Sequence, residues 1–345
     1  MTVRRINLAL QGGGAHGAFT WGVLDRLLSE EDIHVSAISG TSAGALNGAA
    51  FKAGMIEGGR EGARARLDWL WQEVGARPDL HIPQWMTPFS LGDFSTALEY
   101  SWPVMASEAW SRMFSPYSYG PFYRNPLEPI VSQLNFDLVC QENGHGPCLF
   151  VCATRVRNGK VRVFKDSEIS TEAILASACL PTVFQAVELE DAETGTTEAF
   201  WDGGYTGNPA LFPLFNKNLP DDILVVNINP LERTEIPRTA QAIQNRINEI
   251  SFNSSLLREL RAIEFVQRLL DQGTLSTEQK NRVLVHMIAD DALMNELSVA
   301  TKLVPTPYTL ARLKEAGQRA ADAFIEHHKD DLNKRSTIDL PAMFS

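Results

Sequence analysis

The stretch Gly40-Thr41-Ser42-Ala43-Gly44 follows an apolar run at 35–39 and leads directly into a helix-forming run at 45–51. A G-x-S-x-G turn between a strand and a helix has a tight, strained backbone, which projects the serine hydroxyl at the carboxyl end of a sheet. A substrate carbonyl can reach the hydroxyl there. Ser42 is therefore the candidate nucleophile.

A second glycine turn, Gly12-Gly13-Gly14-Ala15-His16-Gly17, lies about one β-α-β unit upstream of Ser42. It also stands between an apolar strand and a helix. Its small residues expose backbone N–H groups at a helix N-terminus, where partial positive charge favours a developing oxyanion. The spacing predicts that both turns lie at the carboxyl ends of neighbouring parallel strands, with Gly12, Gly13 and Gly14 as the oxyanion donors.

Nucleotide binding is the strongest alternative for the upstream turn, because Gly12-x-Gly14-x-x-Gly17 matches the dinucleotide fingerprint. That fingerprint requires an acidic residue at the end of the second strand. This chain has Ser39-Gly40-Thr41-Ser42 there, and its acids at 30–32 precede the strand. A phosphate-binding loop requires a lysine and a hydroxyl residue, but Ala18-Phe19 follow the glycines. The alternative of another class is thus a nucleotide-binding or non-catalytic scaffold protein.

Apolar runs typical of buried strands alternate with runs of helical spacing along the chain. This alternation predicts an α/β fold with a mostly parallel sheet. The expected strands are 5–11, 34–39, 148–154, 183–189, 198–201, 223–228 and 283–288. We expect 1–335 to form a single domain, with the motifs in 5–230 and a helical C-terminal extension over 240–330. From Asp330 onward, and above all over 336–345, we expect a loosely held tail.

Two segments stand apart from this alternation. Residues 80–125 are rich in aromatic side chains, which predicts an insertion over one end of the sheet. It is either a lid that lines an acyl-chain pocket or an irregular insertion around its own small core. Residues 240–270 have the spacing of an amphipathic helix. Docking of its apolar face on the sheet is favoured over membrane binding, because its polar face is mixed in sign. The residues near the apolar face are Ile243, Ile247, Ile250, Leu257, Leu260, Ile263 and Leu270.

The composition limits the class of partner. The 345-residue chain is 44% hydrophobic and carries a net charge of -11 with a pI near 5.2. This charge opposes long-range attraction to nucleic acid or to anionic membranes, so any transient contact with a membrane surface must be apolar or local. The sequence contains no stretch typical of a signal peptide or a spanning helix. Four cysteines without a C-x-x-C pair suit a reduced, cytoplasmic protein. A secreted effector with another kind of signal would have the same composition.

The base that activates Ser42 is found by elimination among the titratable residues. None of the seven histidines occupies the position expected for the last member of a Ser…Asp…His order. His286 lies inside a strand-like run, and His16 suits a structural or pocket-rim role. Asp202-Gly203-Gly204 ends an apolar run, and its glycines allow close approach of another backbone. Asp202 is therefore the candidate base, with a turn aspartate of the common D-G type as the alternative.

With these motifs the chain resembles the patatin-like phospholipases. The resemblance covers roughly 5–230 and rests on the two glycine turns, on the Asp202 turn, on Asn208-Pro209 and on the 178–181 stretch. It implies a three-layer α/β/α fold, with Ser42 and Asp202 as a catalytic dyad without histidine and with Gly12, Gly13 and Gly14 as the oxyanion donors. The family usually has arginine or lysine where this chain has His16.

The resemblance implies a serine lipid acyl hydrolase of the phospholipase A or esterase type, acting on lipids or other acyl esters through an acyl-enzyme. Acyl transfer to an alcohol, or hydrolysis of small esters on the same dyad, is the alternative within this class. No metal or organic cofactor is implied. Cys148 and Cys152 lack the further ligands of a zinc site. Chain-length preference, headgroup and oligomeric state are not encoded in these motifs.

Overall fold

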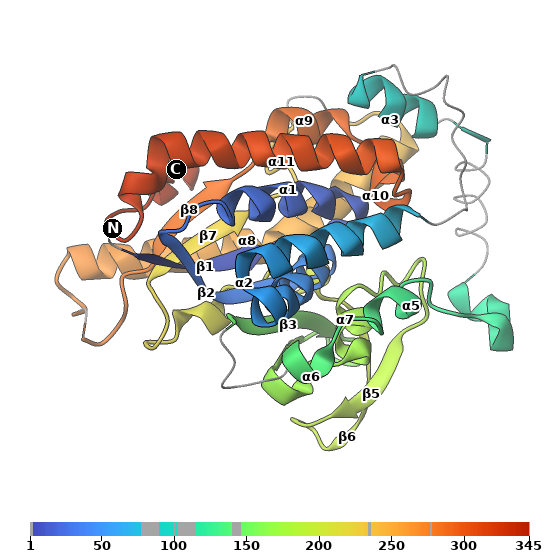
Figure 1. Ribbon diagram of the computed structural model, residues 1–345, viewed down its shortest axis with the longest axis horizontal. Helices are drawn as coiled ribbons and strands as arrows, with labels where there is room; N and C mark the ends of the chain where they lie inside the picture. Colours follow the sequence, from blue (N-terminus) through green and yellow to red (C-terminus); the bar gives the residue numbers. More distant parts are fainter. Residues whose placement is uncertain are drawn as a thin grey trace.

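The computed structural model describes residues 3–76, 90–99, 101–102, 115–139, 146–233, 236–276 and 278–344. An eight-stranded sheet in the order β5-β6-β3-β2-β1-β7-β8, with β4 paired to β3, organises these residues (Figure 1). Strands β3, β2, β1, β7 and β8 run parallel, and β4, β6 and β5 run antiparallel to their neighbours. The mostly parallel sheet predicted from the sequence is confirmed. The strands are β1 Arg4–Leu10, β2 Ile33–Thr41, β3 Cys148–Arg155, β4 Val161–Lys165, β5 Val187–Asp191, β6 Thr196–Asp202, β7 Asp222–Val226 and β8 Leu284–Ile288.

Helices cover both faces of the sheet. The longer ones are α1 Gly17–Leu27, α2 Ala43–Gly75, α8 Ala240–Asp271 and α11 Pro307–His328. The shorter α-helices are α3 Leu91–Glu99, α5 Glu128–Val131, α6 Phe136–Val139, α7 Thr171–Ser177, α9 Asp291–Glu296, α10 Val299–Leu303 and α12 Leu340–Met343. The 3-10 turns are η1 Gly14–His16, η3 Pro116–Phe122, η4 Asp166–Glu168, η5 Gly203–Tyr205, η6 Phe212–Phe215 and η7 Lys329–Asp331.

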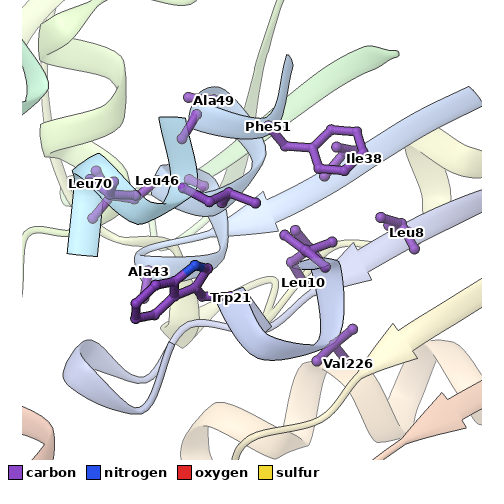
Figure 2. Close-up of a cluster of buried hydrophobic side chains, with 14 of the residues drawn as sticks. Leu8, Leu10, Trp21, Ile38, Ala43, Leu46, Ala49, Phe51, Leu70 and Val226 are labelled. Atoms are coloured by element: carbon purple, nitrogen blue, oxygen red, sulfur yellow. The ribbon is translucent and has the colours of Figure 1, made fainter. Parts of the chain in front are cut away.

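Alternation along the strands divides the core into two layers. Leu8, Leu10 and Val226 belong to the cluster that α1, α2 and α11 cover, and Figure 2 shows them beneath the first turns of α1 and α2. Ala9 and Val225, one position away, belong to the cluster on the opposite face, under α8. The chain therefore forms the three α/β/α layers that the resemblance implies.

The sequence missed β4. Its residues alternate in burial, and the inward positions hold Arg162 and Phe164. A buried arginine breaks the apolar pattern expected of an inner strand face. The structure accommodates it because its guanidinium pairs with the buried Asp191 at 2.8 Å and with Glu168.

The first half of α8 corrects a prediction. Leu260 and Ile263 pack on the sheet as expected, together with Leu256, which takes the place predicted for Leu257. Ile243, Ile247 and Ile250, however, are 43%, 53% and 54% exposed, so the stripe does not dock along its whole length. A 32-residue helix is about 48 Å long, whereas a strand of five residues such as β7 spans only about 17 Å. The first turns of α8 therefore extend beyond the sheet.

The end of the chain is also better held than predicted. Leu332 and Leu340 are buried, and the Thr337 N–H donates to the Val285 carbonyl at 3.1 Å. Asn333 donates its backbone N–H to the Asp222 carboxylate at 2.7 Å. Residues 330–344 thus add backbone and side-chain contacts beside β7 and β8, and the prediction of a loose tail is wrong for them.

Half of the aromatic-rich segment 80–125 lies outside the described residues, namely 80–89, 100 and 103–114. Of its described parts, α3 packs Phe94 edge-on against Tyr308 of α11, with ring centroids 5.4 Å apart. The other part, η3 and Tyr123, lies against the loop before β5, where the Tyr123 hydroxyl accepts the Gln185 N–H at 3.2 Å. The prediction of a lid over the site stays a prediction.

Candidate active site

Ser42 occupies the turn between β2 and α2 with φ 54° and ψ −122°. A positive φ is uncommon for a residue with a side chain, and it is maintained only when the surroundings enforce it. The two motif glycines help to enforce it. A Cβ on Gly40 would lie 2.6 Å from the Gly44 carbonyl oxygen, and a Cβ on Gly44 would lie 2.1 Å from the Leu10 carbonyl oxygen. Only glycine fits at either position.

The upstream glycine turn lies directly beside Ser42, as the spacing predicts. A Cβ on Gly12 would lie 2.7 Å from the Ser42 Cβ. Gly14 has φ 58°, and a Cβ there would lie 2.3 Å from the Lys302 carbonyl oxygen. Because η1 and α1 follow this turn while α2 follows Ser42, two helical N-termini and their positive ends converge on one place.

The amides of the upstream turn differ in their availability. The Gly12 N–H already donates to Asn208 Oδ1 at 2.7 Å. The Gly13 carbonyl accepts the His16 N–H at 3.2 Å. Within the described ranges, the N–H groups of Gly13 and Gly14 donate to no protein acceptor. Two of the three expected donors are therefore free, and Gly12 serves instead as the point of closest approach to Ser42.

Asp202 ends β6 and is buried next to Ser42. Its backbone N–H donates to the Cys179 carbonyl at 2.8 Å, and its carbonyl accepts the Thr154 hydroxyl at 2.8 Å. Its carboxylate accepts the Gly204 N–H at 2.7 Å, and the Ser42 side chain lies close enough to lower the pKa of that carboxyl. The structure thus places the predicted base beside the predicted nucleophile.

Burial raises the pKa of the Asp202 carboxyl to about 7, although the hydrogen bonds from Gly204 and Ser42 oppose that rise. Burial, together with the nearby Asp202 charge, also raises the pKa values of Cys179 and Tyr205 to about 12. The thiol and the phenol are therefore neutral at pH 7. Asp202 is the neighbour of Ser42 that titrates in the range where a general base is effective.

The histidines singled out in the sequence have structural positions. His286 lies on β8, with β1 and β7 between it and the strand of Ser42, and its Nε2 is 2.9 Å from the Asp222 carboxylate. His16 is buried, and its Nε2 lies 2.8 Å from the Thr301 hydroxyl, which itself donates to the Ser298 carbonyl. Burial holds the pKa of His16 well below its usual range, so the ring is neutral.

Three site residues were missed from the sequence. Ser177, at the end of α7, accepts the Ser42 N–H on its Oγ at 2.9 Å. Asn229, just after β7, donates its Nδ2 to the Gly12 carbonyl at 2.8 Å. Lys302, on α10, donates to Asn229 Oδ1 at 2.9 Å. None belongs to a motif, and only the fold brings them to the two turns.

Neither a metal centre nor a spanning helix is found in the part of the chain that the structure describes. Its thiols Cys148, Cys152 and Cys179 are free, with Cys148 exposed and the other two buried. Cys140 lies outside the described residues.

Comparisons with known proteins identify the family of the chain. A family model described as patatin-like phospholipase matches residues 8–215. The solved structure of VipD from Legionella pneumophila is 14% identical, with a TM-score of 0.42, over 94% of this chain and 67% of VipD. The ExoU-SpcU complex from the type III secretion system of Pseudomonas aeruginosa is 17% identical, with a TM-score of 0.31, over 95% of this chain and 61% of the matched one. No curated protein sequence matches the chain. Since the family model spans more than half of the sequence, the chain belongs to the patatin-like phospholipase family, whose activity is lipid acyl hydrolysis.

Proposed function

We propose that the chain is a serine lipid acyl hydrolase that works through Ser42 and Asp202. The observation that carries the proposal is the strained Ser42 turn, whose side chain lies beside the buried Asp202 carboxyl. A carboxylate with a pKa of about 7 is a stronger base than an exposed aspartate. It is ionised in a large fraction of molecules at neutral pH, and it lies beside the hydroxyl whose proton it must take.

In the first half-reaction, Ser42 Oγ attacks the ester carbonyl carbon while its proton passes to Asp202. The carbonyl oxygen becomes an oxyanion, for which the N–H groups of Gly13 and Gly14 are the available donors of the upstream turn. As the tetrahedral species collapses, Asp202 returns the proton to the leaving alkoxide. Water then attacks the acyl-enzyme with Asp202 as its base and releases the fatty acid, restoring Ser42.

We also propose a transient contact between the first half of α8 and the surface of a lipid aggregate. Ile243, Ile247 and Ile250 follow helical spacing and are exposed. Phe252, two residues after Ile250 and on the opposite face of the helix, packs edge-on against Tyr205 at 5.2 Å, beside the Asp202 turn. The same part of α8 thus reaches the Asp202 turn with one face and exposes the isoleucine stripe on the other. With a net charge of -11, the chain suits a neutral or zwitterionic surface better than an anionic one.

The test uses purified protein, a fluorophosphonate probe and p-nitrophenyl esters of short and long chain. Ser42→Ala abolishes both the labelling and the hydrolysis that the wild type shows. In a scaffold or nucleotide-binding protein, the wild type itself would be neither labelled nor active on esters. Labelling that persists in Ser42→Ala rejects the nucleophile. Adding a long-chain alcohol and following the acyl group by mass spectrometry separates hydrolysis from acyl transfer. The cytoplasmic location expected from the composition stays a prediction.

A further inference from the structure

Gly12 is held by two buried amides, Asn208 at its N–H and Asn229 at the carbonyl that begins the Gly12–Gly13 peptide. The Gly12 N–H donates to Asn208 Oδ1 at 2.7 Å. The Gly12 carbonyl accepts Asn229 Nδ2 at 2.8 Å, and Asn208 Nδ2 lies 3.5 Å from the same oxygen. In a trans peptide the carbonyl of one residue and the N–H of the next point in opposite directions. The bond from Asn229 therefore sets the direction of the Gly13 N–H.

The Asn229 amide lies between a cation and this peptide. Its Oδ1 accepts the Lys302 ammonium at 2.9 Å, and its Nδ2 also donates to Gln11 Oε1 at 3.1 Å. An ammonium can only donate and a peptide carbonyl can only accept, so the orientation of the Asn229 side chain is determined by its partners. Gln11 Oε1 also accepts the backbone N–H groups of Ile228 and Asn229, which holds Asn229 from behind.

These bonds form one directed series. Lys302 Nζ donates to Asn229 Oδ1, and Asn229 Nδ2 donates to the Gly12 carbonyl. The Gly13 N–H, which belongs to the same peptide as that carbonyl, ends the series. Each amide accepts on the side of the cation and donates on the side of the glycine turn. Hydrogen bonds aligned in this way polarise one another, most strongly where water is excluded. A positive charge at the start of the series makes the last N–H a better donor to an anion.

The charges around Lys302 leave its ammonium directed at Asn229. Glu249 of α8, the carboxylate whose charge raises the pKa of Lys302, already pairs with Arg233 at 2.6 Å and 2.8 Å. Arg233 adds positive charge from the segment after β7, and the buried ring of His16 in η1 is neutral. Within the described ranges Lys302 has no ion pair of its own.

We propose that Lys302 and Asn229 are positioning residues for the oxyanion site, which orient and polarise the Gly13 N–H through the Gly12–Gly13 peptide. This inference rests on the proposed function. The Lys302 ammonium does not contact the substrate in this proposal. It strengthens the Gly13 N–H, which does.

Three variants test the relay with a soluble p-nitrophenyl ester. Lys302→Met lowers kcat about tenfold and changes KM less than about twofold, because an oxyanion donor acts mainly in the transition state. Lys302→Arg restores at least half of kcat. Asn229→Leu, which removes the donor to the Gly12 carbonyl, lowers kcat at least as much as Lys302→Met. Lys314→Met is the matched control, since it removes a half-buried lysine of α11 that pairs with Asp68.

The pH profile separates the relay from a merely structural role. Burial lowers the pKa of Lys302 to about 8, against the opposing effect of Glu249 and with a further lowering by Arg233. The wild-type kcat therefore falls above about pH 8 as the ammonium loses its proton. Lys302→Met lacks this alkaline limb, and in Lys302→Arg the limb moves to higher pH.

An unchanged kcat in folded Lys302→Met, or an alkaline limb that persists in it, overturns the relay. If Lys302→Met does not fold, Lys302→Arg provides the test. The relay is then overturned if kcat of Lys302→Arg falls at the same alkaline pH as that of the wild type. Hydrolysis that survives Ser42→Ala overturns the proposed function itself, so the two failures are distinguishable.

Discussion

Ser42 donates its backbone N–H to the Oγ of Ser177 at 2.9 Å, which ties the strained turn to the last residue of α7. Both residues are buried. The next residues along the chain reach Asp202, because the Cys179 carbonyl accepts the Asp202 N–H at 2.8 Å. The end of α7 thus positions both members of the proposed dyad.

Ser177→Ala leaves the Ser42 N–H buried without its acceptor. Such a loss costs about 1–3 kcal/mol of unfolding free energy, and the freed turn lets the Ser42 hydroxyl leave the Asp202 carboxyl. We expect kcat to fall at least about tenfold with little change in KM. Urea unfolding and ester kinetics measure the two effects.

Ser170→Ala is the control for Ser177→Ala on the same helix. The Ser170 side chain caps α7 by accepting the Ala173 N–H at 3.2 Å, so its loss costs about 1 kcal/mol. We expect kcat to be unchanged. If both variants lower kcat equally, the effect comes from loosening of α7 and not from the Ser42 turn.

The pH dependence of kcat/KM reports the base. Because burial raises the pKa of Asp202 to about 7 and the reaction requires its ionised form, activity rises with pH and reaches half of its maximum near pH 7. A rate profile from pH 5 to 8 with a soluble ester measures this limb. A half-maximum near pH 4, the value of an ordinary carboxyl, would contradict a buried base.

Stability has the opposite dependence on this carboxyl. The pKa of Asp202 is higher in the folded chain than in the unfolded chain, so the carboxyl favours folding while it is protonated. This contribution to stability is fully present below the unfolded pKa and is lost as the pH rises through about 7. Asp202→Asn keeps an oxygen for the Gly204 N–H and has no proton to lose. We expect it to abolish hydrolysis and to raise the Tm at pH 8, by about 2–4 °C for each kcal/mol gained.

Glu259→Gln is the matched control for Asp202→Asn. Burial also raises the pKa of Glu259 to about 7, and its carboxylate accepts the Leu211 and Phe212 N–H groups at 2.9 Å and 2.8 Å. The pKa shift has the same direction as that of Asp202, so Glu259→Gln also raises the Tm at pH 8. It leaves kcat unchanged, because Glu259 is not a member of the proposed dyad. A lower Tm at pH 8 for both amides would show that the carboxylates stabilise the fold when ionised.

Local patterns in the sequence predicted most of this architecture. The turn at Ser42 could be recognised because glycine is required where Gly40 and Gly44 meet backbone, and the strands because their inner faces are apolar. β4 escaped because Arg162 occupies an inner position, where its ion pairs with Asp191 and Glu168 make the burial acceptable. Ser177, Asn229 and Lys302 escaped for a related reason: each acts through hydrogen bonds to residues far away in the sequence, which no local pattern encodes.

The exposed isoleucines of α8 lead to the last prediction. Ile247→Glu places a charge on the exposed stripe of α8 without disturbing the core, since this side chain is 53% exposed. Hydrolysis of phosphatidylcholine vesicles then falls at least about tenfold, because burying a carboxylate in a lipid surface is costly. Hydrolysis of a soluble short-chain ester stays within about twofold, because Ser42 and Asp202 are untouched.

Phe265→Glu provides the comparison, since Phe265 is 49% exposed on the later half of the same helix. It adds the same charge away from Phe252, where α8 meets the Asp202 turn. If the stripe binds lipid, only Ile247→Glu lowers the hydrolysis of vesicles while it leaves the hydrolysis of the soluble ester unchanged. Equal losses on vesicles in both variants would instead indicate that added negative charge repels the chain from any lipid surface, and the docking role of the stripe would be rejected.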